Sequence, residues 1–150
     1  MAHLETSQAP QLYEALIEQS PDATIFADPA GKIQVWNPSA EAIFGYSRQE
    51  AIGQSLDIII PENLRKPHWA GFESAMKMGH TAHGRQVITT RATHKNGSKI
   101  YVNLSFGIVC DAQGKAVGAM AQARDFTARY MEEKALRKRI AELEAGSARK

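Results

Sequence analysis

His68, Phe72 and Met76 follow one another at intervals of four residues, so on a helix their side chains lie on one face. An imidazole on such an apolar stripe can hold a flat hydrophobic macrocycle through one ring nitrogen, while the other nitrogen needs a carbonyl or carboxylate partner. The alternative is a partly exposed histidine near a helix start, with Phe72 and Met76 as ordinary core residues, and the residues alone favour it. Trp69 lies one helical step, about 100°, from His68, which favours a packing role for the indole.

Arg85 is the second residue whose chemistry suits a small ligand. It falls near the start of an expected strand, 84–94. Facing a cavity, its planar guanidinium suits a carboxylate or a polarised diatomic ligand. Facing solvent, it has no such role, and the sequence leaves both orientations open.

Composition and motifs exclude several classes of function. The 150 residues are 43% hydrophobic and 23% charged, as in an ordinary globular domain. No apolar run approaches the roughly 20 residues that cross a bilayer, and the first residues lack the features of a secretion signal. The single cysteine, Cys110, rules out an internal disulfide and a multi-cysteine zinc site, which is consistent with the cytoplasm. The sequence has no phosphate-binding loop, zinc-protease motif or nucleophile–base constellation, so we expect no enzyme.

The positive charge is confined to the C-terminal segment. Residues 128–150 carry a balance of +3 and the remaining residues a balance of −1. Because the basic residues alternate with glutamates on an expected helix, they are typical of a solvated helix surface rather than of a face that reads nucleic acid. We therefore expect neither a nucleic-acid nor a membrane partner.

Hydrophobic periodicity and turn residues predict an α+β domain. The expected helices cover residues 10–20, 38–44, 47–52, 62–78 and 127–145, with residues 146–150 frayed. The expected strands cover residues 23–27, 32–36, 84–94, 98–109 and 115–125. Grouped strands joined by glycine-containing turns indicate an antiparallel sheet, and the helices between the second and third strands would cover one face of it. A cavity between that face and the helices is the natural place for a small molecule.

Several helix ends have specific signals. Asn37 before Pro38 is typical of an N-cap, and Gly45 is typical of the residue that ends the same helix. Ser47 and Glu50 have the spacing of a capping box. Gly79 is expected to end the long helix.

Two stretches, 20–56 and 94–129, resemble PAS domains, most specifically in N-x-x-A-E-x-x-F-G-Y at 37–46 and R-D-F-T at 124–127. The resemblance implies the PAS fold, a five-stranded antiparallel sheet with helices on one face and flanking helices at both termini. It divides the chain into an N-terminal flanking helix at 1–20, a sensory domain at 21–127 and a C-terminal signalling helix of coiled-coil type at 128–150. PAS domains bind haem, flavin, small acids or nothing, so the fold alone fixes no function.

The run P-E-x-x-R-x-x-H at 61–68 resembles the haem-binding PAS oxygen sensors of the FixL type, in which this histidine ligates the haem iron. The resemblance implies haem b with His68 as the metal ligand and with Phe72 and Met76 beside it. It also places Arg85, Leu104 and Phe106 on the distal side, where a diatomic gas would bind. Ser74 stands near the position at which those sensors carry a propionate-binding arginine.

Further residues have weaker assignments. His80 and His83 could each bond a haem propionate, and His83 could be a sixth iron ligand, but loop histidines are more often simply exposed. Met120 could approach the distal side or fill the core. Flavin photoreceptors need a cysteine at the start of the long helix, whereas Cys110 lies at a strand end, so we expect no flavin-adduct photochemistry.

The last expected helix carries Leu136, Ile140 and Leu143 at heptad spacing. With an amphipathic first helix, this seam predicts a parallel homodimer through both flanking helices; the alternative is a lone helix packed on the sheet. Together these features predict a cytoplasmic haem-binding sensor of O2, CO or NO that signals through its C-terminal helix to a downstream protein. The alternative is a PAS module with another small ligand or none, used for dimerisation and protein–protein signalling.

Overall fold

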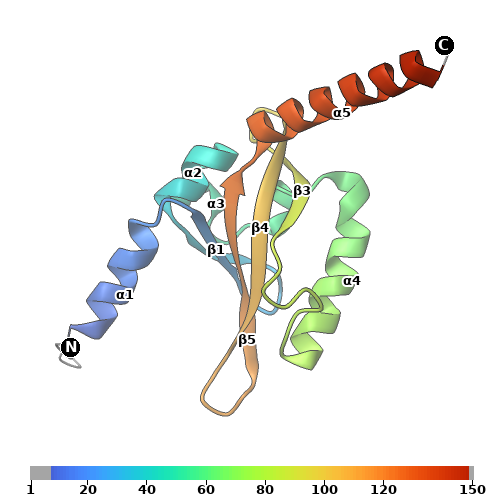
Figure 1. Cartoon of the computed structure of the whole chain (residues 1–150). Coiled ribbons are helices and arrows are strands. Elements are labelled where there is room, and N and C mark those ends of the chain that lie inside the picture. The colour runs from blue at the N-terminus through green and yellow to red at the C-terminus, as the bar shows by residue number, and fades with distance from the viewer. Residues whose placement is uncertain (1–7, 149–150) are drawn as a thin grey trace, which may run out of the picture.

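The computed structural model describes residues 8–148 (Figure 1). The helices are α1 (Ala9–Glu18), α2 (Pro38–Phe44), α3 (Arg48–Ala51), the 3-10 helix η1 (Leu56–Ile58), α4 (Glu62–Met78) and α5 (Thr127–Ala148). The strands are β1 (Ala23–Ala27), β2 (Ile33–Trp36), β3 (Ile88–Thr93), β4 (Lys99–Cys110) and β5 (Ala116–Asp125). Of the expected terminal segments, residues 1–7 and 149–150 lie outside the described residues.

All five strands form one antiparallel sheet in the order β2-β1-β5-β4-β3, which confirms the predicted fold class. The central strand β5 joins the N-terminal hairpin to the C-terminal strands, so the first and last parts of the sequence share one sheet. Helix α4 lies beside one face of the sheet, while α1 and α5 project from the body of the domain (Figure 1). No helix within residues 8–148 has both the length and the apolar character needed to cross a membrane.

The predicted helix ends are confirmed. Asn37 caps α2, since its Oδ1 accepts from the Ala40 amide at 3.1 Å, and Gly45 ends that helix at a φ of 84°. Ser47 and Glu50 form the complete capping box of α3. These short, well-capped helices carry the chain from β2 to the start of α4.

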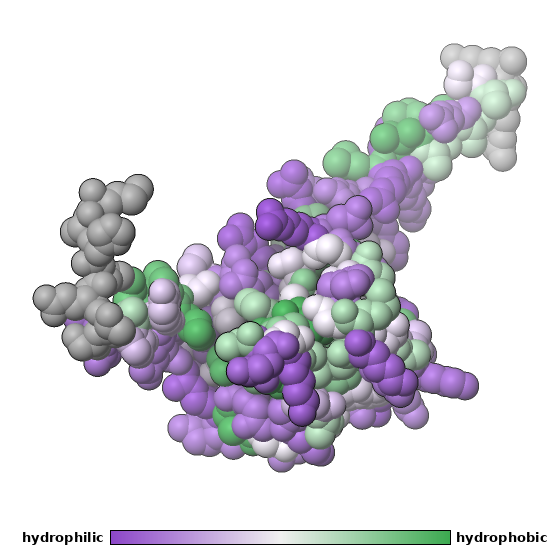
Figure 2. Space-filling view, turned by 90° about the horizontal axis from the view of Figure 1, so that it is seen from below, coloured by the Kyte–Doolittle hydropathy of each residue, from purple (hydrophilic) through white to green (hydrophobic). Residues whose placement is uncertain are grey.

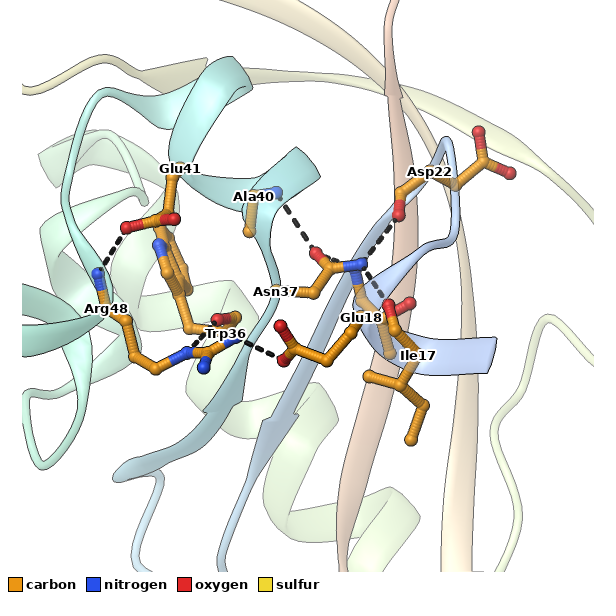
Figure 3. A network of polar contacts seen from close by, with 9 residues as sticks. Ile17, Glu18, Asp22, Trp36, Asn37, Ala40, Glu41 and Arg48 are labelled. Atoms are coloured by element: carbon orange, nitrogen blue, oxygen red, sulfur yellow. Dashed lines mark hydrogen bonds and ion pairs between the residues drawn. The ribbon is translucent and has the colours of Figure 1, made fainter. Parts of the chain in front are cut away.

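A polar network attaches α1 to the domain (Figure 3). The Asn37 side-chain amide donates to the carbonyl oxygens of Ile17 at 2.8 Å and Asp22 at 3.0 Å. Arg48 forms an ion pair with Glu18, and its Nε donates to a carbonyl oxygen of β2 at 3.0 Å. Asn37 is fully buried. The same side chain therefore caps the start of α2 and holds the end of α1.

Most boundaries lie within one or two residues of the expectation, and two differ by more. The third strand begins at Ile88 rather than at residue 84, because the preceding residues form a turn in which Gly84 has a φ of 59° and its amide donates to Thr81 Oγ1 at 3.1 Å. Helix α5 continues to Ala148, so residues 146–148, predicted to fray, are helical. One glycine costs a helix only about 1 kcal/mol, and Gly146 does not end it.

Candidate functional site

A cavity of about 400 Å³ lies between α4 and one face of the sheet. Its helical wall is made of residues three or four apart on α4, namely Leu64, Pro67, His68, Gly71, Phe72 and Ala75. The sheet wall includes Val102, Leu104 and Phe106 of β4 and alternate residues of β5. This volume and mainly apolar lining are those of a small-molecule site.

Three alanines of β5 make room for the cavity. Ala119, Ala121 and Ala123 are two residues apart, so all three face the same side of the sheet, and all three line the cavity. In the sheet, Ala121 is the partner of Phe106 and Ala123 is the partner of Leu104. These three residues were not predicted to line a site, although small side chains at every second position of a strand indicate space beside the sheet.

His68 lies in the helical wall of this cavity. Burial lowers the pKa of its imidazole below the usual 6.5, an effect that the negative charge of Asp57 partly offsets. Among residues 8–148 neither ring nitrogen has a hydrogen-bond partner, and Nδ1 is buried. The expected carbonyl or carboxylate partner is therefore missing from the described part of the chain, and a neutral imidazole is available to a ligand.

Aromatic contacts orient the His68 ring instead. The Trp69 indole meets it edge-on with ring centroids 4.7 Å apart, and the Phe72 ring lies 6.2 Å away. Trp69 Nε1 donates to Asp57 Oδ1 at 2.7 Å, and the indole covers Gly31, where a Cβ atom would come within 2.3 Å of the ring. The predicted packing role of Trp69 is confirmed, whereas no sequence pattern indicated its partner Asp57.

Met76 does not line the cavity, unlike Phe72 and Ala75. Eight residues of an α-helix turn the chain about 80° past two full turns, whereas seven residues fall only about 20° short of them. Ala75 therefore stands above His68, and Met76 has turned away from the cavity. Of the predicted stripe, His68 and Phe72 share the cavity-facing side of the helix, and Met76 does not.

The remaining candidates on β4 and β5 divide between the two faces of the sheet. Leu104 and Phe106 line the cavity. Met120 borders it between two alanines, but its sheet partner is Gly107, and a Cβ atom on Gly107 would lie 3.4 Å from Met120 Cγ. Because directly paired residues share a face, the Met120 side chain lies on the face opposite Phe106.

The loop between α4 and β3 carries three of the candidate residues, Arg85, His80 and His83. Arg85 lies in a turn, is exposed and is not part of the cavity lining. His80 is also exposed and outside the lining. His83 is exposed as well, but it also lines the edge of the cavity, with its ring centroid 6.5 Å from that of Phe106. Within the described residues, no group of three or more histidine, cysteine, aspartate or glutamate side chains gathers in a metal-binding arrangement.

A mixed helix-and-sheet domain with an apolar cavity under one long helix defines a small-ligand or scaffold module, and comparison with known proteins identifies its family. The family model of the PAS fold matches residues 11–126. The chain therefore belongs to the PAS family. The PAS domain of a protein from Colwellia psychrerythraea superimposes with a TM-score of 0.70 at 23% identity, covering 80% of this chain and 98% of that one.

Curated relatives connect the chain to sensor proteins. It is 29% identical over 109 residues to the oxygen sensor protein DosP of Escherichia coli, covering 73% of this chain and 13% of that protein. It is 43% identical over 54 residues to the sensor protein FixL of Bradyrhizobium diazoefficiens, covering 36% of this chain and 11% of that protein. The chain thus spans a small part of the length of these relatives and is a PAS sensor domain related to signalling proteins.

Proposed function

We propose that this domain binds haem b through His68 and senses a diatomic gas. The observation that carries the proposal is the His68 imidazole, which lines a large apolar cavity and has no hydrogen-bond partner among residues 8–148. When bound, haem supplies an iron atom that takes up O2, CO or NO. The chain itself supplies the imidazole, the apolar walls of the cavity, and the sheet and α5, which would change when gas binds.

The residues of the cavity fit this group. The lowered pKa of His68 favours the neutral imidazole that ligates a metal. Gly71 and Ala75 on α4 and the alanines of β5 leave space for a flat macrocycle between helix and sheet. Leu104 and Phe106 lie in the opposite wall and would restrict water on the distal side. The names of the relatives, an oxygen sensor and the sensor FixL, support the same reading.

The route for a signal runs through the sheet to α5. Val102, Leu104 and Phe106 of β4 line the cavity, and β4 contacts the start of α5, where the Phe126 amide donates to the Tyr101 carbonyl oxygen at 2.8 Å. A ligand that binds one of two arrangements of this sheet more tightly than the other shifts the population toward that arrangement. The orientation of α5 would change with the sheet. We place this non-enzymatic sensing role in the cytoplasm, with an output to a downstream protein.

The same proposal includes a parallel homodimer through α5. The seam residues of α5 are 54–57% exposed, namely Leu136, Ile140 and Leu143. Figure 2 shows apolar residues on the part of α5 that projects beyond the body of the domain. With Leu136 at heptad position d, Glu132 and Arg139 fall at g positions, and Arg137 and Glu144 fall at e positions. A parallel pair then brings Glu132 to Arg137 and Arg139 to Glu144 of a second copy, and both contacts join opposite charges.

Titration of the purified chain with hemin tests the haem proposal. Wild type is expected to take up one hemin per chain and to develop a Soret band. His68→Ala is expected to lose the band, and His68→Gly is expected to regain it when free imidazole is added. His80→Ala removes an exposed histidine outside the cavity and serves as the matched control. A wild type that takes up no hemin, or a His68→Ala variant that binds it unchanged, contradicts the proposal and favours a PAS module with another ligand or none.

A further inference from the structure

His83 is the second imidazole at the edge of the cavity. Of the cavity residues, three have ionisable side chains, namely His68, His83 and Arg91. Arg91 is paired with Tyr101, the neighbour of the cavity-facing Val102, so alternation directs its side chain to the other face of the sheet. The cavity therefore has one histidine in its helical wall and one in the loop at its edge.

His83 lies near the sheet wall of the cavity. Its ring centroid is 6.5 Å from that of Phe106, a residue of the sheet wall, with an angle of 37° between the rings. His68 is in the helical wall. A planar group between helix and sheet thus has His68 on one side and the loop histidine near the other.

The residues that the sequence proposed for the distal side do not compete for this place. Arg85 is exposed and outside the lining, and the Met120 side chain lies on the far face of the sheet. Leu104 and Phe106 are apolar. Among the described residues, the His83 side chain has no hydrogen bond or ion pair, so no other contact fixes it.

We propose that His83 is a displaceable sixth ligand, which binds the haem iron on the face opposite His68 when no gas is present; the inference rests on the proposed haem function. Imidazole nitrogen is a common ligand of haem iron, and His83 carries it on a loop rather than on a helix or strand. Gas must displace His83, so the loop between α4 and β3 rearranges when gas binds. This movement would connect iron occupancy to β3 and the rest of the sheet.

Electronic absorption and electron paramagnetic resonance spectra of the hemin-loaded full chain test the assignment. Ferric wild type is expected to be six-coordinate and low-spin. His83→Ala is expected to bind hemin at the same stoichiometry but to become high-spin. Its ferrous form is expected to bind CO at least tenfold faster, because no ligand has to leave. His80→Ala, a change three residues earlier on the same loop, is the matched control and is expected to resemble wild type in both measurements.

The outcomes separate this inference from the haem proposal. If wild type takes up hemin through His68 but is high-spin, or if His83→Ala keeps the low-spin spectrum, the assignment of His83 is wrong and the haem proposal stands. If wild type takes up no hemin, both are wrong. A low-spin wild type that becomes high-spin in His83→Ala and not in His80→Ala supports both.

Discussion

Tyr101 of β4 and Tyr130 of α5 stack face to face, with ring centroids 3.6 Å apart and an angle of 13° between the ring planes. Beside them, the Tyr101 amide donates to Thr127 Oγ1 at 3.0 Å. The next residue along β4, Val102, lines the cavity. The stack therefore joins the strand that borders the cavity to the helix that leaves the domain.

We expect this stack to stabilise the attachment of α5. Tyr101→Leu and Tyr130→Leu keep apolar side chains but remove the ring pair, and a double-mutant cycle is expected to give a coupling energy of about 0.5–1.5 kcal/mol. Urea unfolding of the four proteins measures it. A coupling energy near zero shows that the ring pair adds nothing to the attachment of α5 beyond the hydrogen bonds of Thr127 and Phe126 to Tyr101.

Filling the cavity is expected to exclude haem without damaging the fold. Ala121→Leu adds a branched side chain opposite the α4 wall, and hemin affinity is expected to fall at least tenfold, or about 1.4 kcal/mol. Gln122→Leu places the same side chain on the other face of the same strand and is expected to leave hemin affinity unchanged. Spectroscopic titration measures both. Equal affinities in the two variants would mean that hemin binds outside this cavity.

The Glu50–Lys95 pair is expected to make stability depend on pH below about 4.5. The Glu50 carboxylate accepts hydrogen bonds from the Lys95 ammonium and the Ser47 amide, and these lower the pKa of Glu50 from 4.5 to about 2. A carboxylate whose pKa is lower in the folded state stabilises fully above its unfolded pKa, and this contribution is lost as the pH falls from about 4.5 through 2. The difference in free energy of unfolding between wild type and Glu50→Gln should therefore shrink over that interval.

Carbon-13 NMR titration checks the cause. In Lys95→Met, the pKa of Glu50 is expected to return toward 4.5, because the hydrogen bond from Lys95, the largest cause of the lowered pKa, is removed. Lys99→Met, which removes a lysine outside any ion pair of the described residues, is the control. An unchanged pKa in Lys95→Met would assign the shift to the capping box instead.

Dimerisation through α5 is expected to depend on its heptad seam. Ile140→Asp places a charge in the seam, and the weight-average mass from sedimentation equilibrium is expected to fall to that of a monomer. Lys138→Asp lies at heptad position f, away from the seam, and is expected to leave the mass unchanged. Exchanging the charges of Arg139 and Glu144 together should preserve the dimer, whereas Arg139→Glu alone should weaken it. A monomeric wild type contradicts the proposal.

Local rules predicted the elements and most of the framework. The caps at Asn37 and Ser47, the end of α4 at Gly79 and the alternation in the strands depend on neighbours within a few residues, so the sequence contains the information. The motif at 61–68 indicated His68 by resemblance. Met76 lies outside the cavity lining because intervals of four drift around a helix with 3.6 residues per turn.

The order of helices and strands, the antiparallel sheet and the choice of His68 as the candidate ligand all follow from the sequence alone. The tertiary structure decided which side chains share the cavity. The pairing of β4 with β5 sets the face on which the Met120 side chain lies, and the turn before β3 keeps Arg85 outside the cavity. The position of the Trp69 indole depends on its hydrogen bond to Asp57, twelve residues away. Such contacts are set by how separate elements dock, and no local pattern encodes them.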